Sequence, residues 1–348
     1  MKILMVGLGG IGQRHLRNLN AILGAEAEFL AYRVRRLKHV VTDTLEIQSG
    51  GNIEEKYNIR SFSDLDEALA QKPEVVFICN PSSMHLPIAI KSAQQGCHLF
   101  LEKPLSHNMD GVDELIQLVE KGHLVAMVGY QFRFHPLVKR VHALLAEGKI
   151  GKIISVRAEA GEYMPAWHKY EDYRQMYAAR KDLGGGVLLS QIHEFDYLYW
   201  FFGTPDRVFA SGGHLSNLEI DVEDTAEILM ESEVNGRVMS INVHLDYIQR
   251  PPSRNLKIIG DAGKICMDMI GLSLQVYDAS GVQVDNIVLD NFQRNDIFID
   301  QTKHFLACLR GKARPPVTLR DGAQSLRMAI AVKQSMETGT VVTLKRKI

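Results

Sequence analysis

A glycine-rich loop at the start of the chain constrains the fold more than any other feature. Residues 7–12 read Gly-Leu-Gly-Gly-Ile-Gly, which matches G-x-G-x-x-G, and they lie between a short apolar run, Lys2–Val6, and a helical pattern, Ile11–Leu23. In this pattern the glycines allow a tight turn, a close approach to a pyrophosphate and close packing of helix on strand. The helix N-terminus adds free N–H groups for the anion. The loop predicts a dinucleotide site whose contacts are Gly7, Gly9, Gly10, Ile11 and Gly12.

Short apolar runs alternate with helical patterns through the first 130 residues. The predicted strands are Lys2–Val6, Glu28–Tyr32, Val75–Cys79, His98–Leu101 and Leu124–Val128. The predicted helices between them are Ile11–Leu23, Asp64–Gln71, His85–Gln95 and Met109–Lys121. This alternation is typical of βαβ units and a parallel sheet. We therefore expect an α/β fold that begins with a doubly wound Rossmann domain.

The pattern changes after about residue 150. Asp224–Val234 and Arg237–Tyr247 flank Asn235-Gly236, which is a strong hairpin signal. A second pair of predicted strands is Leu256–Ile259 and Lys264–Met267. The predicted helices of this part are Pro136–Glu147, Val187–Phe202, Phe298–Leu309 and Asp321–Thr338. Such a pattern predicts an α+β domain with an open, mainly antiparallel sheet and helices on one face. We expect the boundary between residues 123 and 130, which separates a domain of residues 1–125 from one of residues 126–348.

Composition argues against several functional classes. The net charge of −1 disfavours nucleic-acid and membrane-surface binders, which usually carry a basic excess. No apolar stretch approaches the length of a membrane span, and the apolar run after Met1 is too short for a signal peptide. The four cysteines form no C-x-x-C pair, so we expect no metal site. Scattered thiols fit a reducing compartment, so we expect a cytoplasmic protein. We expect its partner to be a small molecule.

The end of the second predicted strand bears on the choice of cofactor. NAD-selective domains usually place an acidic residue about 20 residues past the glycines. No acid lies between Phe29 and Lys38, whereas Arg33, Arg35 and Arg36 do. Arginines at this place suit a 2′-phosphate. Arg33 is nearest the strand end and is the best candidate for the contact to this phosphate. For Arg35 and Arg36 the alternative is that they belong to a solvated basic surface. We expect NADP(H) to be preferred, with NAD(H) as the alternative cofactor.

Three further motifs follow in order. Asn80-Pro81 and His85 follow one predicted strand, Glu102-Lys103-Pro104 ends the next, and Gly184-Gly185-Gly186 leads to His193. Together with the glycine loop, this ordered set resembles the glucose–fructose oxidoreductase and inositol dehydrogenase family, Gfo/Idh/MocA, over the full length. The resemblance implies a hydride transfer between nicotinamide and a secondary alcohol or ketone of a sugar. It also implies a large open C-terminal sheet through which homodimers or homotetramers assemble.

The resemblance assigns the proton chemistry to Lys103 and His193. Hydride transfer from an alcohol needs a group that takes the hydroxyl proton. Lys103 follows a predicted parallel strand, at the edge where such sheets bind ligands. We interpret Asp196, on the face of the helix that carries His193, as a structural carboxylate that orients a neighbour. The resemblance also implies a cis Lys103–Pro104 bond. Further cofactor contacts are expected from Asn80, Pro81, His85, Glu102 and Lys103.

The chain departs from the family pattern at Ser190. Many relatives carry aspartate three or four residues before the helical histidine, whereas this chain has Ser190 and Leu189 there. A serine cannot act as a charged partner, so we expect Ser190 only to position a substrate hydroxyl. Two aromatic and polar segments, residues 130–136 and 163–174, are expected to contribute to the same site. The predicted substrate contacts are Arg133, Tyr163, Trp167, His168, Arg174, Ser190 and His193.

Three functions follow as hypotheses. The first is a dehydrogenase or reductase acting on a sugar or sugar derivative, including nucleotide sugars and surface-sugar precursors. The second is an inositol or cyclitol dehydrogenase. The third is a non-catalytic, nicotinamide-binding redox sensor, which the missing aspartate suggests and which Lys103 and His193 argue against.

Overall fold

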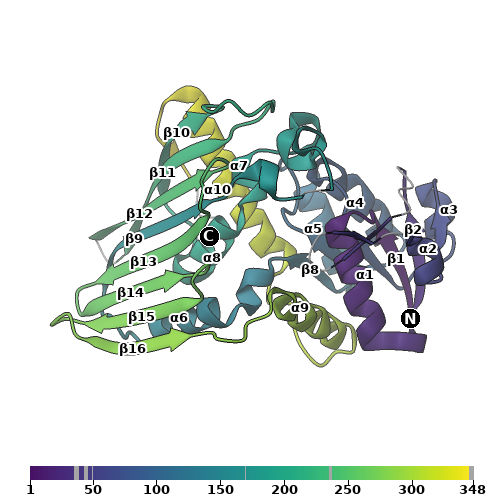
Figure 1. Ribbon diagram of the computed structural model, residues 1–348, viewed down its shortest axis with the longest axis horizontal. Coiled ribbons are helices and arrows are strands. Elements are labelled where there is room, and N and C mark those ends of the chain that lie inside the picture. The colour runs from purple at the N-terminus through teal and green to yellow at the C-terminus, as the bar shows by residue number, and fades with distance from the viewer. Residues whose placement is uncertain (35–38, 43–45, 49, 169, 235–236, 345–348) are drawn as a thin grey trace.

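The computed structural model describes residues 1–34, 39–42, 46–48, 50–168, 170–234 and 237–344. It consists of two parts that lie side by side, an α/β domain that holds the N-terminus and a domain built on one large sheet (Figure 1). No helix in these ranges is both long enough and apolar enough to cross a membrane.

The first domain contains a six-stranded parallel sheet in the order β5-β2-β1-β6-β7-β8. Its strands are β1 Lys2–Val6, β2 Glu28–Tyr32, β5 Arg60–Phe62, β6 Val75–Ile78, β7 His98–Glu102 and β8 Ala126–Gly129. Its helices are α1 Gly10–Leu23, α2 Ile53–Lys56, α3 Leu65–Leu69, α4 His85–Gln94 and α5 Val112–Lys121. The strand order reverses between β1 and β6, and the carboxyl ends of the strands at such a point form the ligand crevice of open α/β sheets. A separate two-stranded ribbon pairs β3 Val40–Val41 with β4 Ile47–Gln48.

The central strands of this sheet are mainly apolar because helices cover both faces. Every residue of β6 is buried, as are Ile3–Val6 of β1 and Leu99–Glu102 of β7. The core therefore fixes where the strands end, and the glycine loop, Asn80 and Lys103 all follow at that edge.

The second domain is built on a nine-stranded sheet in the order β16-β15-β14-β13-β9-β12-β11-β10-β17. Its strands are β9 Ile153–Gly161, β10 Arg207–Gly213, β11 Thr225–Val234, β12 Arg237–Asp246, β13 Ser253–Gly260, β14 Gly263–Asp268, β15 Ser273–Asp278, β16 Gln283–Val288 and β17 Val342–Thr343. Its helices are α6 Pro136–Ala146, α7 Val187–Ser190, α8 His193–Phe202, α9 Arg294–Leu309 and α10 Leu319–Thr338. Among the described strands of this second sheet, only β9 and β12 pair in parallel.

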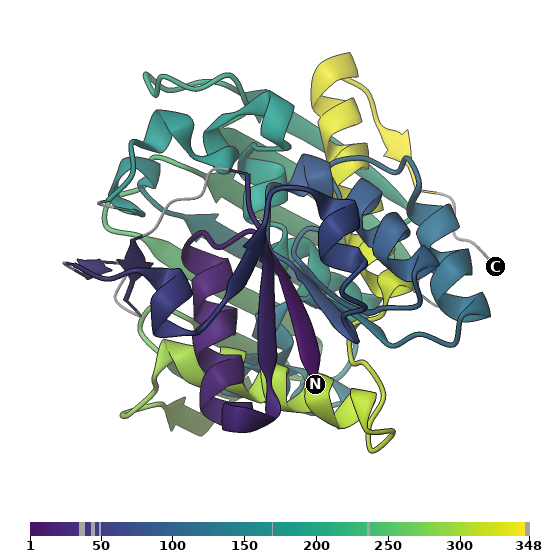
Figure 2. The same cartoon turned by 90° about the vertical axis from the view of Figure 1, so that its right-hand side faces the viewer.

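Helices α6, α8 and α10 cover the face of this sheet that looks toward the first domain, and the other face is open (Figure 1). Helix α9 follows the edge strand β16 of the large sheet and packs against α1, the helix that begins in the glycine loop (Figure 2). Asn295 on α9 accepts a hydrogen bond from Arg14 on α1 over 3.1 Å. The two domains therefore meet around the carboxyl edge of the parallel sheet.

The predicted fold class is confirmed, and most predicted elements lie within a few residues of their expected bounds. β8 begins at Ala126 and pairs with β7, so the parallel sheet extends beyond the expected boundary at residue 125. The expected turn at Asn235-Gly236 lies outside the described residues, although β11 and β12 pair as predicted.

The prediction of one continuous helix over Val187–Phe202 was wrong. The chain forms α7 and α8, separated by Gln191 and Ile192. The Gln191 side chain donates a hydrogen bond to the carbonyl of Asp246, 3.0 Å away at the end of β12. This tertiary contact accompanies a non-helical backbone at Gln191, where φ is −100° and ψ is 30°.

Candidate active site

The glycine loop has the geometry of a phosphate cradle. Gly7 has φ +83°, a conformation that side chains rarely adopt. A Cβ at Gly12 would lie 2.1 Å from the carbonyl oxygen of Gly7, so only glycine fits there. A Cβ at Gly9 would meet no protein atom within 4 Å, and no side chain caps α1 at this residue. The free N–H groups of α1 therefore face open space at the place where a pyrophosphate would bind, so these residues fit a dinucleotide.

Asn80 and His85 flank the next strand end. The Oδ1 atom of Asn80 is buried and has no hydrogen-bond partner within the described chain. The Nε2 atom of His85 lies 2.8 Å from the carbonyl oxygen of Asn80, and its Nδ1 atom lies 2.9 Å from that of Pro104. Burial lowers the pKa of His85, so the neutral imidazole donates a hydrogen bond to one of these oxygens. His85 therefore lies between the loops that follow β6 and β7, and its expected contact with the cofactor stays a prediction.

Lys103 connects the two domains. Its Nζ atom donates a hydrogen bond to the carbonyl oxygen of Ser190 over 2.7 Å, at the last residue of α7. The Lys103–Pro104 peptide is cis, as the resemblance implied. The preceding Glu102 is buried and accepts a hydrogen bond from the Lys103 N–H over 3.2 Å. A fully buried histidine of α1, His15, lies 2.6 Å from the Glu102 carboxylate. Sequence reasoning missed His15, although its place three residues after the last glycine of the loop was visible.

His193 is buried at the N-terminus of α8. Its ring lies against Phe132, with 4.3 Å between the ring centroids. The side-chain amide of Gln131 donates a hydrogen bond to Nε2 of His193 over 3.2 Å, and Nδ1 has no partner among the residues described. The pKa of His193 lies well below its ordinary value because of burial and, after that, of three nearby cations, Lys103, Arg254 and Arg294. His193 is therefore neutral, and Nδ1 is its ring nitrogen without a partner among the described residues.

The glycine triplet brings α7 against the first domain. Gly184 has φ +77°, and a Cβ there would lie 2.7 Å from the Cβ of His107 and 3.1 Å from that of Ser82. Those two residues follow β7 and β6. Ser190 is buried at the end of α7, and its hydroxyl lowers the pKa of the neighbouring Tyr247 phenol, which burial raises. The triplet, Ser190 and Lys103 thus meet at the expected crevice.

Arg133 is not a substrate residue in this structure. Its Nε and Nη2 atoms donate to Asp196 over 3.0 and 2.8 Å, and Nη1 donates to the carbonyl oxygen of Pro316. Both side chains are buried, and a buried charge needs such a partner. The interpretation of Asp196 as an orienting carboxylate fits this pair. Arg133 is corrected from a substrate contact to a structural ion pair.

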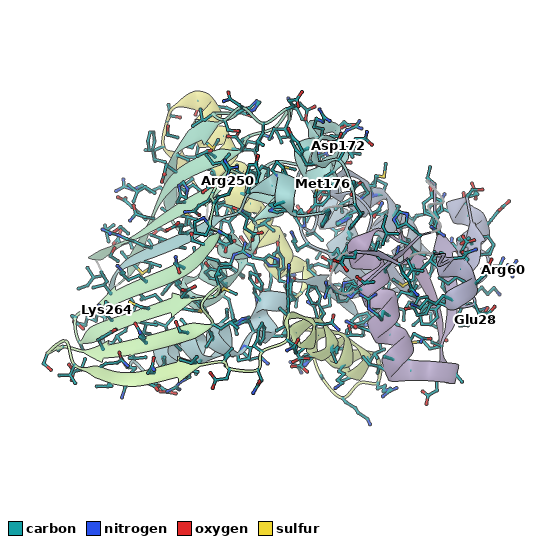
Figure 3. All side chains as sticks on the ribbon, viewed as in Figure 1. Glu28, Arg60, Asp172, Met176, Arg250 and Lys264 are labelled. Carbon is teal, nitrogen blue, oxygen red and sulfur yellow. The ribbon has the colours of Figure 1, made fainter. Side chains whose placement is uncertain are left out.

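The second predicted substrate segment runs over the domain junction, where Figure 3 labels Asp172 and Met176. Arg174 is half exposed and pairs with Asp172 and with Glu219, so its guanidinium is already engaged. The ring of His168 stacks on that of Tyr170 at 5.3 Å.

Trp167 and Tyr163 belong to the same segment. The Trp167 Nε1 atom is buried without a partner in the described ranges. Tyr163 stacks under the Arg250 guanidinium, 4.0 Å from its ring centroid. The expected contacts of Trp167 and Tyr163 with substrate stay predictions.

Arg33, the predicted contact to a 2′-phosphate, is also paired. It is only 5% exposed, and its Nη1 atom donates to Glu54 of α2 over 2.7 Å. Ser61 donates to the same carboxylate oxygen over 2.6 Å. Arg35 and Arg36 lie outside the described residues. An acidic residue of α2 therefore lies beside the arginine that follows β2.

Two arginines beside His193 were missed by sequence reasoning. Arg254, at the start of β13, donates to the buried Glu194 over 2.9 Å and lies over the Phe132 ring. Arg294 is the first residue of α9. No local pattern marks either residue, because the sheet and the interdomain packing bring them to His193.

These features define an oxidoreductase that binds a nicotinamide dinucleotide: a phosphate cradle, a lysine at the same sheet edge and a neutral histidine facing it. The chain belongs to the Gfo/Idh/MocA oxidoreductase family. Residues 1–130 match its NAD-binding Rossmann fold and residues 142–344 match its C-terminal alpha/beta domain.

Known relatives cover the whole chain. A myo-inositol 2-dehydrogenase of Thermotoga maritima is 27% identical, with 100% of both chains covered. A D-xylose 1-dehydrogenase (NADP(+)) of Haloferax volcanii is 23% identical, with 98% of both covered. The crystal structure of the WlbA dehydrogenase from Bordetella pertussis, solved with NADH and UDP-GlcNAcA, superposes with a TM-score of 0.79 at 21% identity and covers 99% of this chain and 98% of its own.

Proposed function

We propose that the protein is an NAD(P)-dependent dehydrogenase or reductase that acts on a secondary alcohol or ketone of a sugar or sugar derivative. The observation that carries the proposal is the meeting of Lys103 with the end of α7, three residues before a buried, neutral His193. Dehydrogenases of inositol and of xylose among the relatives support a polyhydroxylated substrate.

The two residues divide the proton chemistry. The Nδ1–H of His193 donates to the substrate oxygen and fixes its position. Lys103 takes the hydroxyl proton during oxidation and returns it during reduction, because its Nζ atom is the ionisable group at the strand end. Phe132 covers one face of the His193 ring and keeps water from it. Ser190, beside Tyr247, positions a further hydroxyl.

The dinucleotide, when bound, supplies the nicotinamide that accepts or gives the hydride. Gly7, Gly9 and Gly12 would hold its pyrophosphate, and Asn80 would offer its unpartnered amide oxygen. The sequence favours NADP(H) through Arg33. Because Glu54 occupies that guanidinium, we propose that NAD(H) is bound as well.

A substrate panel with both cofactors tests the function. Purified protein is mixed with NAD⁺ or NADP⁺ and with aldoses, uronates, sugar phosphates and cyclitols, and formation of the reduced cofactor is followed by absorbance. Turnover of sugars supports the leading proposal, and turnover of cyclitols alone supports an inositol dehydrogenase. Tight cofactor binding with no turnover, and no oxidation of bound reduced cofactor by any keto-sugar, contradicts both and favours a redox sensor.

We propose that the protein acts in the cytoplasm as a homodimer or homotetramer assembled through the open face of the large sheet. Outward-facing apolar residues on its strands, among them Phe209, Leu229 and Ile259, support an interface there. The four free thiols fit a reducing compartment. Light scattering on the purified protein measures the assembly, and a monomer at micromolar concentration would contradict it.

A further inference from the structure

A buried pair of side chains below the carboxyl edge of the parallel sheet has no part in the chemistry described above. His15, on α1, is fully buried, and its Nε2 atom lies 2.6 Å from the carboxylate of Glu102, the last residue of β7. A ring nitrogen and a carboxylate oxygen this close both carry lone pairs, so one of them must hold a proton that the other accepts. The two side chains therefore form one hydrogen-bonded unit that joins α1 to β7.

Apolar packing alone does not explain an imidazole at this place. The ring of His15 lies among three phenylalanine rings, and the distances between ring centroids are 4.9 Å to Phe100, 5.8 Å to Phe77 and 6.1 Å to Phe298. Its Nδ1 atom has no partner among the described residues, so its one hydrogen bond there is the contact with Glu102. A phenylalanine or a leucine would fill such a site without burying a polar atom. The imidazole is therefore placed for the Glu102 carboxylate.

Glu102 connects His15 to Lys103. Its Oε1 atom bonds to His15, and its Oε2 atom accepts the backbone N–H of Lys103 over 3.2 Å. A Cβ at Gly129 of β8 would lie 3.1 Å from Oε1, so the carboxylate has little room to turn. A buried carboxylate costs free energy unless its oxygens are bonded. Without His15, the carboxylate would lose the partner that fixes it, and the turn that begins at Lys103 would lose its support.

The helix that carries His15 also carries the phosphate cradle. Helix α1 begins at Gly10, and His15 lies roughly 7.5 Å further along the helix axis. The free N–H groups at the N-terminus of α1 would hold the pyrophosphate. Helix α1 is therefore a rigid link between the pyrophosphate site and the turn of Lys103. Hydride and proton transfer depend on the alignment of the reacting groups, so this link bears on the rate of the reaction.

We propose that His15 is a positioning residue, which holds Lys103 in place relative to a dinucleotide bound at the N-terminus of α1. Because the His15 side chain has no exposed surface, it acts through Glu102 and the backbone N–H of Lys103. This inference rests on the proposed function, since it concerns the group that takes the hydroxyl proton. Loss of the contact leaves the phosphate cradle intact and displaces Lys103, so turnover falls while cofactor binding is retained.

Two amides of different length provide a matched pair of variants. His15→Gln retains a donor that can reach the Glu102 carboxylate, whereas the amide of His15→Asn is too short to reach it. Both variants bury an amide among the same phenylalanines, so a general loss of stability is common to both. We expect His15→Asn to lower kcat roughly 10- to 100-fold, the cost of a misplaced group, and His15→Gln to keep most of the wild-type kcat. The dissociation constant of the reduced cofactor, followed by nicotinamide fluorescence, should be nearly unaltered in both.

Further variants test the route and the specificity of the effect. Glu102→Met removes the other partner and should also lower kcat, and the double variant with His15→Asn should lose no more than Glu102→Met alone. His98→Phe is the control, because it removes a hydrogen bond that His98 accepts from the Val125 N–H over 3.0 Å at the other end of β7. This control should leave kcat as in the wild type.

Three results would overturn the positioning role. The first is a kcat of His15→Asn equal to that of the wild type, even where the melting temperature falls, because His15 would then only pack the core. The second is an equal loss of kcat in His15→Asn and His15→Gln. The third is additive losses in the double variant, because His15 would then act by a route other than Glu102.

Acetylation of Lys103 separates this proposal from the proposed function. In the wild type, the Nζ atom of Lys103 is bonded to the carbonyl oxygen of Ser190, 2.7 Å away. Its rate of reaction with acetic anhydride is measured by mass spectrometry relative to that of Lys91 on the surface of α4. Faster labelling of Lys103 in His15→Asn than in His15→Gln supports the positioning role, even where the wild type turns over no substrate and the proposed function fails. Equal labelling of Lys103 in both variants and the wild type would overturn the positioning role.

Discussion

The cofactor side of the crevice is built from backbone, whereas the substrate side is built from charged side chains. On the cofactor side, Gly7, Gly9 and Gly12 lie within six residues and leave N–H groups open to a ligand. On the substrate side, Arg254 and Arg294 arrive from a strand and a helix far from His193 in sequence. The cofactor side requires glycine at residues 7 and 12, where the backbone leaves no room for a side chain or has a positive φ. The substrate side depends on which charged side chains the fold pairs with one another. Substitutions there can therefore change specificity without moving the backbone.

The largest expected effect concerns Lys103, which joins the two sides through the Ser190 carbonyl. Lys103→Met should retain cofactor binding and lose roughly 10²- to 10⁴-fold in turnover, the range of a positioned acid or base. Cofactor affinity and kcat are both measured, with Lys91→Met as the control because Lys91 pairs with Asp66 on the surface. Unaltered turnover in Lys103→Met would show that the lysine only ties α7 to the first domain.

The two sides also differ in how far the sequence predicts them. The strands β1 and β2 begin and end at their predicted residues, because buried parallel strands appear as unbroken apolar runs. The glycine loop, Lys103 and His193 stand in local motifs that the sequence displays directly. Predictions of contacts made by arginine were less successful, since Arg33, Arg133 and Arg174 each pair with an acid of the chain.

Most of the unforeseen partners are distant in sequence, although Asp172 lies only two residues from Arg174. The partner of Arg33 lies 21 residues away, that of Arg254 lies 60 residues away, and that of His15 lies 87 residues away. A long cationic side chain can reach a substrate or a carboxylate equally well, and tertiary packing decides which one it meets. The break between α7 and α8 has the same origin, because the contact of Gln191 with β12 overrides the helical pattern.

The next largest expected effect is a difference in kcat between substitutions of His193 and of Ser190, which both lie on the substrate side. His193→Ala should lower kcat at least tenfold more than Ser190→Ala, because the imidazole offers the unpartnered Nδ1 atom while the serine only positions a hydroxyl. Thermal melts accompany the kinetics and establish that both variants are folded. The reverse ranking would place the reacting hydroxyl at Ser190 and move the proton chemistry away from α8.

A smaller effect concerns the acid stability of the substrate side. His135 caps α6 by accepting the N–H of Leu137, and burial lowers the pKa of its imidazole to about 4. The unfolded chain takes up this proton near pH 6.5, whereas the folded protein does not. Stability from this group is therefore complete above pH 6.5 and is lost as the pH falls toward 4, by about 1 kcal/mol at pH 5.5.

His135→Asn tests that assignment, because asparagine can cap the helix but does not titrate. Urea unfolding at pH 8 and pH 5.5 should show a decline in stability that is smaller in the variant than in the wild type by about 1 kcal/mol. Equal declines would mean that other groups carry the acid sensitivity of this domain.

The smallest expected effect concerns the cofactor side, which contains one charged pair as well as the glycine loop. Glu54 holds Arg33 at 2.7 Å and is 28% exposed, so the pair contributes about 1 kcal/mol. Glu54→Gln removes the carboxylate beside the Arg33 guanidinium, which would repel a 2′-phosphate. The affinity for NADP(H) relative to NAD(H) should therefore rise about fivefold, measured by fluorescence titration with both reduced cofactors. Glu55→Gln is the matched control, since Glu55 is the next residue of α2 and its carboxylate bonds only to Asn52 among the hydrogen bonds described. A ratio unaltered in Glu54→Gln would mean that Arg33 and Glu54 lie outside the reach of the adenosine ribose, and the whole cofactor side would then select its ligand through backbone alone.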